Sequence, residues 1–181
     1  MVFMDLTLNS DNFKKHKTLW KQLISDISNV LHKKVQIIFP DNWNEFYYLW
    51  FQDVEKNAFR EDLRYNFSDV NDRLRNLNVL FFFIIVDQKP EALFLGYSPQ
   101  GAENQTYYID TIAVKHQGQG IGRFMLKSVI EWAKKENFNT IMLDTEEIDE
   151  KKILLQKFYK GFGFRVVKKD QNENLTMVLK I

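Results

Sequence analysis

A strand, a glycine-rich turn and a helix follow one another directly between residues 107 and 136. The extended stretch 107–114 leads into Gln117–Gly122, whose sequence is QGQGIG, and helical periodicity then continues to about Glu136. Glycines let the backbone approach a ligand closely, and a helix N-terminus adds unpaired N–H donors and the positive end of a dipole. The turn is therefore predicted to bind an anionic phosphate group. A tight turn that binds nothing is the alternative.

Two kinds of nucleotide site fit this turn poorly. A P-loop requires Gly-Lys-Ser/Thr at its last glycine, but here Arg123 and Phe124 follow Gly122. A dinucleotide fingerprint needs a glycine at position 123 and opens the first βαβ unit of a chain, whereas this turn follows three strands that we expect to be antiparallel. The sequence therefore favours neither Walker-type nor dinucleotide binding.

Hydrophobic spacing divides the rest of the chain into helices followed by strands. The first part is predicted to begin with a helix capped within Ser10–Asn12 and ending near Leu31, followed by a strand at 35–39. A second helix is predicted to start at Asp41 or Asn42, with Glu45 in a capping box. A third, short helix is predicted to be capped by Ser68 or Asp69 and to include Leu74 and Leu77. The second part is predicted to contain strands at 79–86, 91–97, 107–114, 140–144, 164–168 and 174–181 and a further helix at 153–159. This order predicts an α/β (α+β) fold with a mixed sheet and flanking helices.

Composition narrows the classes of function. The chain has 181 residues and no Pro/Gly/Ser-rich linker, which indicates one compact unit. It has no cysteine, which excludes disulfides and thiolate nucleophiles, and its 3 histidines lack the spacing of metal ligands, so no metal is expected. The formal net charge of +1 and the short apolar runs predict neither a nucleic-acid nor a membrane partner. The N-terminus lacks the pattern of a signal peptide, so we expect a soluble, cytoplasmic protein.

Three motifs in this order resemble the GCN5-related N-acetyltransferase (GNAT) superfamily. Gln117, Gly120 and Gly122 match its pyrophosphate-binding pattern Gln/Arg-x-x-Gly-x-Gly/Ala, the strand TIMLD ends at Asp144, and Tyr159 precedes a Gly-Phe pair at a helix end. The resemblance covers roughly residues 79–181. It implies a mostly antiparallel sheet, splayed at an acetyl-CoA site, in one acetyltransferase domain at 34–181. Residues 1–33 add a helix that the common core of the family does not require, and we expect this extension to pack on the domain.

The resemblance also implies where acetyl-CoA, the cosubstrate, binds. The main chain of Ile112 and Val114, with Ala113 between them, would hold the pantetheine arm like an added strand. Arg123 would lie near the pyrophosphate, which the backbone amides of the turn would hold; these belong to Gln117, Gly118, Gln119, Gly120, Ile121 and Gly122. Many members carry an asparagine and an alanine shortly before the tyrosine, but here these positions are Lys152 and Leu155, so that contact is not assigned.

Three residues are candidates for the chemistry of acetyl transfer. Because the chain has no cysteine, direct attack of a primary amine in a ternary complex is the simplest route. Tyr159 matches the tyrosine of the family and is the candidate general acid, with a packed helical tyrosine as the alternative. Asp110 and Asp144 are equal candidates for the general base, and each has an ordinary strand-end carboxylate as its alternative.

The acceptor and one other function class stay open. The family acts on small-molecule amines and on protein or peptide amines. The acidic run from Asp144 to Glu150 has two interpretations: it attracts a cationic acceptor, or it is an ordinary solvated loop. The segment from Val54 to Leu74 resembles the helix pair that shapes the acceptor side in the family. The alternative function is a non-catalytic acyl-CoA-binding or regulatory module, and a nucleotide-binding oxidoreductase is a distant third. The strand ending at Ile181 is a candidate for pairing between subunits in a homodimer.

Overall fold

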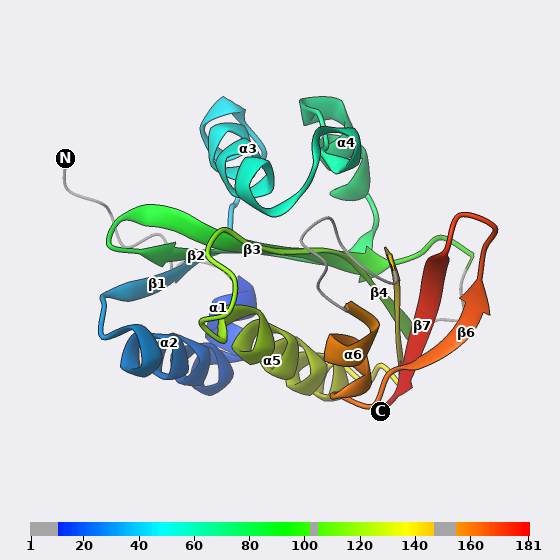
Figure 1. Cartoon of the computed structure of the whole chain (residues 1–181). Coiled ribbons are helices and arrows are strands. Elements are labelled where there is room, and N and C mark those ends of the chain that lie inside the picture. The colour runs from blue at the N-terminus through cyan, green and yellow to red at the C-terminus, as the bar shows by residue number, and fades with distance from the viewer. Residues whose placement is uncertain (1–10, 102–104, 147–154) are drawn as a thin grey trace.

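A seven-stranded sheet forms the centre of the computed structural model, which describes residues 11–101, 105–146 and 155–181 (Figure 1). The strands are β1 (Val35–Ile38), β2 (Leu77–Val86), β3 (Lys89–Ser98), β4 (Thr106–Val114), β5 (Thr140–Glu146), β6 (Arg165–Lys169) and β7 (Asn174–Lys180). They lie in the order β1-β2-β3-β4-β5-β7-β6. All neighbours pair antiparallel except β4 and β5, which are parallel. The expected mixed, mostly antiparallel sheet is confirmed.

Helices cover both faces of this sheet. They are α1 (Asp11–Lys15), α2 (Lys17–Leu31), α3 (Glu45–Ala58), α4 (Phe67–Arg73), α5 (Ile121–Lys135) and α6 (Leu155–Lys160), with a short 3-10 helix, η2 (Glu61–Leu63). α3 and α4 lie on one face, and α2, α5 and α6 lie on the other (Figure 1).

The apolar side chains of β2 pack on both faces of the sheet. Leu80, Phe82 and Ile84 are buried in the core that contains α2 and α5, whereas Phe81 and Phe83 are buried in the core that contains α3. Side chains alternate between the two faces of a strand, so a strand that is covered on both sides is apolar at every position.

Helix α2 packs into the same hydrophobic core as α5. Trp20, Leu23 and Ile27 of α2 are all fully buried. The ring of Trp20 lies 5.4 Å from that of Phe39 and 5.5 Å from that of Phe82, measured between centroids. The division into an extension at 1–33 and a domain at 34–181 stays a prediction, but α2 packs as part of the main core.

The first helix differs from the expectation of one continuous element. α1 ends at Lys15 and α2 begins at Lys17, with His16 between them in a non-helical conformation. The His16 ring nitrogen Nε2 lies 2.5 Å from Glu136 Oε1, and Lys15 Nζ lies 2.6 Å from the same oxygen. The helix therefore breaks where two of its side chains bind a carboxylate just after the end of α5.

The starts of the next two helices were predicted wrongly. The N-cap of α3 is Asn44, not Asp41 or Asn42, because its side chain accepts the backbone N–H of Tyr47. The cap of α4 is Asn66: its side chain accepts the N–H of Asp69, and the Asp69 carboxylate accepts the N–H of Asn66. These reciprocal bonds place the helix start two or three residues earlier than the expected caps, Ser68 and Asp69. Residue 77 also proves to begin β2 rather than to end this helix.

The C-terminal strand has no free edge. β7 pairs with β5 on one side and with β6 on the other, so the expectation that the strand ending at Ile181 pairs between subunits is wrong for this strand. The expected cap at Ser10, the start of the helix at residue 153 and the position of Lys152 lie outside the described residues. In the part of the chain that is described, no helix has the length and apolar character needed to cross a membrane.

Candidate active site

The parallel strands β4 and β5 separate at one end. Their last paired residues are Ile109 and Leu143, whereas β4 continues to Val114 and β5 to Glu146. Both separated ends line one cavity of about 310 Å³. This separation is the expected splay of the sheet. The described lining residues are Ala58, Phe59, Leu63, Tyr65, Ile109, Asp110, Thr111, Ile112, Ala113, Val114, Gln117, Leu143, Asp144, Thr145, Glu146, Leu155, Tyr159 and Asn174.

A β-bulge lies in β4 where the two strands part. Leu95 pairs with Thr111 and Gly96 pairs with Ile109, so Asp110 is the extra residue. In a regular strand, side chains three positions apart point to opposite faces of the sheet. Ile109 before the bulge and Ile112 after it instead both pack in the core that contains α5, because the extra residue shifts the alternation by one position. β4 therefore changes which of its side chains face the cavity at this point.

The Asp110 carboxylate is almost completely buried and has several partners. Its Oδ2 accepts hydrogen bonds from Arg73 Nε at 3.0 Å and from the Tyr97 hydroxyl at 2.8 Å, and its Oδ1 accepts one from Thr111 Oγ1 at 2.9 Å. The side chain is 4% exposed. Of the two predicted general bases, Asp110 is thus the one whose charge a guanidinium already neutralises.

Asp144 has a different environment on β5. Its Oδ2 accepts a hydrogen bond from the Tyr108 hydroxyl at 3.1 Å, and its Oδ1 accepts one from Thr176 Oγ1 at 2.5 Å. Both donors are neutral, and no Lys, Arg or His among the described residues forms an ion pair with this carboxylate. Asp144 is exposed and lines the cavity, so it presents there a negative charge that pairs with no cation in the described part of the chain.

Tyr159 reaches the same cavity from α6. It is 8% exposed, and its ring packs against those of Phe158 and Phe164 with centroid distances of 5.2 and 5.7 Å. Burial raises the pKa of Tyr159 to about 12. The phenol therefore keeps its proton at neutral pH and can donate a hydrogen bond to a group in the cavity.

The glycine turn joins the end of β4 to α5. Gly118 and Gly120 have φ angles of +86° and +85°, which only glycine adopts without strain, and α5 begins directly afterwards at Ile121. A Cβ atom at Gly118 would meet nothing within 4 Å, so the backbone is open to an approaching group. The first N–H groups of α5 have no partner within the helix. These features fit an anionic diphosphate.

The structure brings most predicted site residues to one cavity. Its lining includes Asp110, Ile112, Ala113, Val114, Gln117, Asp144 and Tyr159. Gly118 to Arg123 do not line it, but they follow Gln117 directly in the chain. The Arg123 guanidinium lies over the ring of Phe162, 5.5 Å from its centroid.

A family model described as the acetyltransferase (GNAT) family matches residues 37–164. This chain belongs to the GNAT family. The match begins inside β1 and ends just before β6, so it includes the splayed strands, the glycine turn and Tyr159. No curated protein sequence matches the chain.

Solved GNAT structures share the fold at low sequence identity. The ribosomal-protein-S18-alanine N-acetyltransferase from Escherichia coli superposes with a TM-score of 0.62 at 16% identity, covering 81% of this chain and 94% of that one. PaiA N-acetyltransferase from Thermoplasma acidophilum, in complex with coenzyme A, gives 0.59 at 14%, with coverages of 82% and 99%. An acetyltransferase from Bacillus subtilis in complex with CoA gives 0.58 at 19%, with the same coverages.

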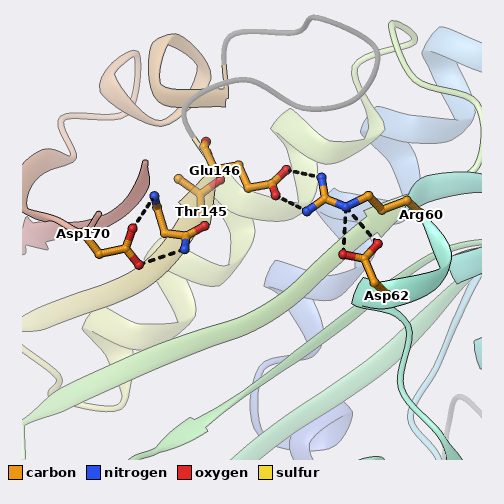
Figure 2. A network of polar contacts seen from close by, with 6 residues as sticks. Arg60, Asp62, Thr145, Glu146 and Asp170 are labelled. Carbon is orange, nitrogen blue, oxygen red and sulfur yellow. Dashed lines mark hydrogen bonds and ion pairs between the residues drawn. The ribbon is translucent and has the colours of Figure 1, made fainter. Parts of the chain in front are cut away.

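An ion pair joins the two walls of the GNAT cleft. Arg60, between α3 and η2, donates from both terminal nitrogens to Glu146 at the end of β5, with 3.0 Å between Nη1 and Oε2 (Figure 2). Its Nε also lies 2.9 and 3.0 Å from the two carboxylate oxygens of Asp62. Beside Glu146, Asn174 donates its side-chain amide to Asp170 at 2.8 Å. Sequence reasoning missed Arg60, because nothing local links residues 86 positions apart.

A buried carboxyl of α3 was also missed. Glu55 is 1% exposed, and its carboxyl accepts the backbone N–H of Tyr65 at 3.0 Å. Burial raises the pKa of Glu55 to about 7, against the lowering effects of that hydrogen bond and of Arg64 and Arg73. A signal was present in the sequence: Glu55 follows Phe51 by four residues and therefore lies on the apolar face of the helix.

Proposed function

We propose that this chain is an N-acetyltransferase that transfers the acetyl group of acetyl-CoA to a primary amine by direct attack in a ternary complex. One observation supports this most strongly. Asp144, a carboxylate without a cationic partner among the described residues, and Tyr159, a phenol that keeps its proton, line the same cavity in the opening between β4 and β5.

The residues present fit coenzyme A, whose acetyl thioester would supply the activated acyl group. The N–H groups at the start of α5 and the open backbone at Gly118 suit its diphosphate. Beyond Ile109, β4 is not paired with β5, so Ile112 and Val114 have main-chain groups available on that side for an extended arm. Arg123 lies in the first turn of α5 and would add a positive charge.

Asp144 is proposed as the group that accepts the proton of the amine. Amines are mostly protonated at neutral pH and attack a carbonyl carbon only as the neutral form. The Asp144 carboxylate attracts the ammonium ion and takes its proton, directly or through a water molecule. Asp110 suits this role less well, because Arg73 and Tyr97 already engage its oxygen atoms.

Tyr159 is proposed as the proton donor to the departing sulfur. In the transfer, a bond forms between the amine nitrogen and the acetyl carbon, and the bond between that carbon and sulfur breaks. The ammonium ion loses one proton before the attack and the nitrogen loses a second as the amide forms, while the sulfur gains one. The products are therefore an amide, a free thiol and one proton released to solvent. A tyrosine with a pKa of about 12 is protonated before the step and regains its proton from solvent afterwards.

The acceptor is proposed to be a small-molecule amine or a protein or peptide amine. One structural neighbour is named for acetylating the alanine of a ribosomal protein, which is a reason to include peptide N-termini among the candidates. The apolar residues Ala58, Phe59 and Leu63 on one side of the cavity and the carboxylates on the other would both contact this acceptor.

The test is release of free thiol from acetyl-CoA in the presence of alkylamines, amino acids and peptides, with the acetylated product identified by mass spectrometry. Acetyl-CoA binding is measured separately by calorimetry. We expect binding, and thiol release that depends on the amine and falls about 100-fold or more in Asp144→Asn. Glu131→Gln, an exposed carboxylate on α5, is the matched control. Binding without thiol release for any amine would instead favour a non-catalytic acyl-CoA module.

A further inference from the structure

Three carboxylates are among the described residues that line the cavity, and of these Asp144 alone has no cationic partner within the described residues. The described lining includes Asp110, Asp144 and Glu146 and no Lys, Arg or His. Arg73 neutralises Asp110, and Arg60 neutralises Glu146 from just outside the lining. The charge balance at Glu146 therefore depends on one guanidinium that lies at the edge of the cavity.

Arg60 binds two carboxylates, those of Glu146 and Asp62. Its terminal nitrogens bind Glu146 and its Nε binds Asp62, so the two carboxylates together direct the planar guanidinium (Figure 2). The segment that carries Arg60 follows Phe59, which lines the cavity opposite β5. The pair thus links the apolar wall to the acidic wall at the end of β5.

Asp144 and Glu146 are two positions apart on β5, so they lie on the same side of the strand, roughly 6.6 Å apart along it. Without Arg60, these two carboxylates would form a double anionic site suited to an amine that carries a second ammonium group. With Arg60 in place, its guanidinium already satisfies Glu146 and repels a second ammonium.

We propose that Arg60 is a specificity-determining residue that selects acceptors with a single positive charge on an apolar carrier and rejects short diamines. This rests on the proposed function, since it concerns the acceptor of the same site. The ammonium binds at Asp144, the apolar carrier lies against Ala58, Phe59 and Leu63, and the position beside Glu146 is occupied by Arg60.

The experiment compares butylamine with 1,4-diaminobutane in wild type, Arg60→Gln and the double variant Arg60→Gln/Glu146→Gln. Both kcat/KM for thiol release and amine affinity for the CoA-saturated protein are measured. Wild type is expected to prefer the monoamine. Arg60→Gln is expected to raise the diamine-to-monoamine ratio roughly tenfold or more, because it exposes the Glu146 charge. The double variant is expected to return near the wild-type ratio, because both charges are gone.

Controls and outcomes separate this inference from the proposed function. Arg75→Gln removes an exposed guanidinium that pairs with Asp72 outside the cavity, and it should leave the ratio unchanged. A wild-type preference for the diamine, an unchanged ratio in Arg60→Gln, or no amine binding to any variant would overturn the inference. If the diamine-to-monoamine ratio of affinities changes in Arg60→Gln as predicted, but no amine causes thiol release, the proposed function is overturned and this inference about acceptor binding stands.

Discussion

The hydroxyl of Tyr108 on β4 donates a hydrogen bond to Asp144 Oδ2 on β5, 3.1 Å away, at the point where the two strands separate. Burial, together with the neighbouring charge of Asp144, raises the pKa of Tyr108 above its usual range, so the hydroxyl remains a donor. This bond and that of Thr176 fix the carboxylate at the opening of the cavity. Tyr108 is therefore a positioning residue for Asp144.

Removing this hydroxyl should impair turnover without affecting the cofactor site. In Tyr108→Phe we expect kcat to fall about 5-fold to 20-fold, because a lost hydrogen bond to a charged group costs about 1.5–3 kcal/mol and part of it positions the carboxylate. The KM for acetyl-CoA should be unchanged in steady-state thiol release. Tyr48→Phe, which removes a hydroxyl that accepts a hydrogen bond from Gln52 on α3, is the control. Wild-type kcat in Tyr108→Phe would contradict the positioning role.

Tyr159→Phe tests the proton donor. We expect kcat to fall about 100-fold or more, because the departing sulfur loses its donor, while the affinity for CoA stays within about twofold. Since the pKa of Tyr159 is about 12, wild-type activity should not decline between pH 7 and 10 through ionisation of this residue. A pH–rate profile and calorimetry check both points, and a fully active Tyr159→Phe would remove Tyr159 from the chemistry.

Glu55 predicts a pH dependence of stability. Its pKa rises from 4.5 in the unfolded chain to about 7 in the folded one, so between these values the folded state holds a proton that the unfolded state has released. Stability contributed by the neutral carboxyl is complete below about pH 4.5 and is lost as pH rises through about 7, by about 1–3 kcal/mol. Urea unfolding of wild type and Glu55→Gln at pH 5 and 8 measures this. The variant should lack that loss, and an equal loss in both proteins would contradict the assignment.

Trp20 tests whether α2 belongs to the main core. The side chain is fully buried against Phe39 and Phe82, so Trp20→Ala should destabilise the fold by about 3–5 kcal/mol. Val30→Ala on the same helix removes a side chain that is 51% exposed and should cost less than about 0.5 kcal/mol. Denaturant unfolding compares the two. Similar small losses would show that α2 is a loosely attached extension.

Much of the fold could be predicted because its signals are local. The run at β2, the hairpin that follows it and the glycine turn before α5 each depend on residues close in the chain. Helix starts were harder, because neighbouring polar residues compete as caps: Asn42 and Asn44 both precede α3, and only the bond to Tyr47 decides between them. The break at His16 depends on Glu136, 120 residues away, so no local pattern predicts it.

In the candidate site, too, local sequence signals could be predicted and contacts between distant residues could not. Tyr159, Asp144 and the glycine turn were found because they resemble a family motif or end a strand. The neutralisation of Asp110 by Arg73 and of Glu146 by Arg60 arises where α4 and the segment after α3 pack near the strand ends. These contacts leave Asp144 as the lining carboxylate with no cationic partner among the residues that the structure describes, and they depend on the folded chain.

The glycine turn and the splayed strands are proposed to form a coenzyme A site. Calorimetric titration of CoA into wild type, Gly120→Glu and Gly101→Glu tests this proposal. Both glycines have positive φ, at +85° and +75°, so the two variants carry comparable backbone strain, but only position 120 lies in the turn. We predict binding by wild type and Gly101→Glu and its loss in Gly120→Glu, because a carboxylate would occupy the phosphate position. No binding by wild type, or equal binding by all three proteins, would show that the glycine turn does not hold coenzyme A.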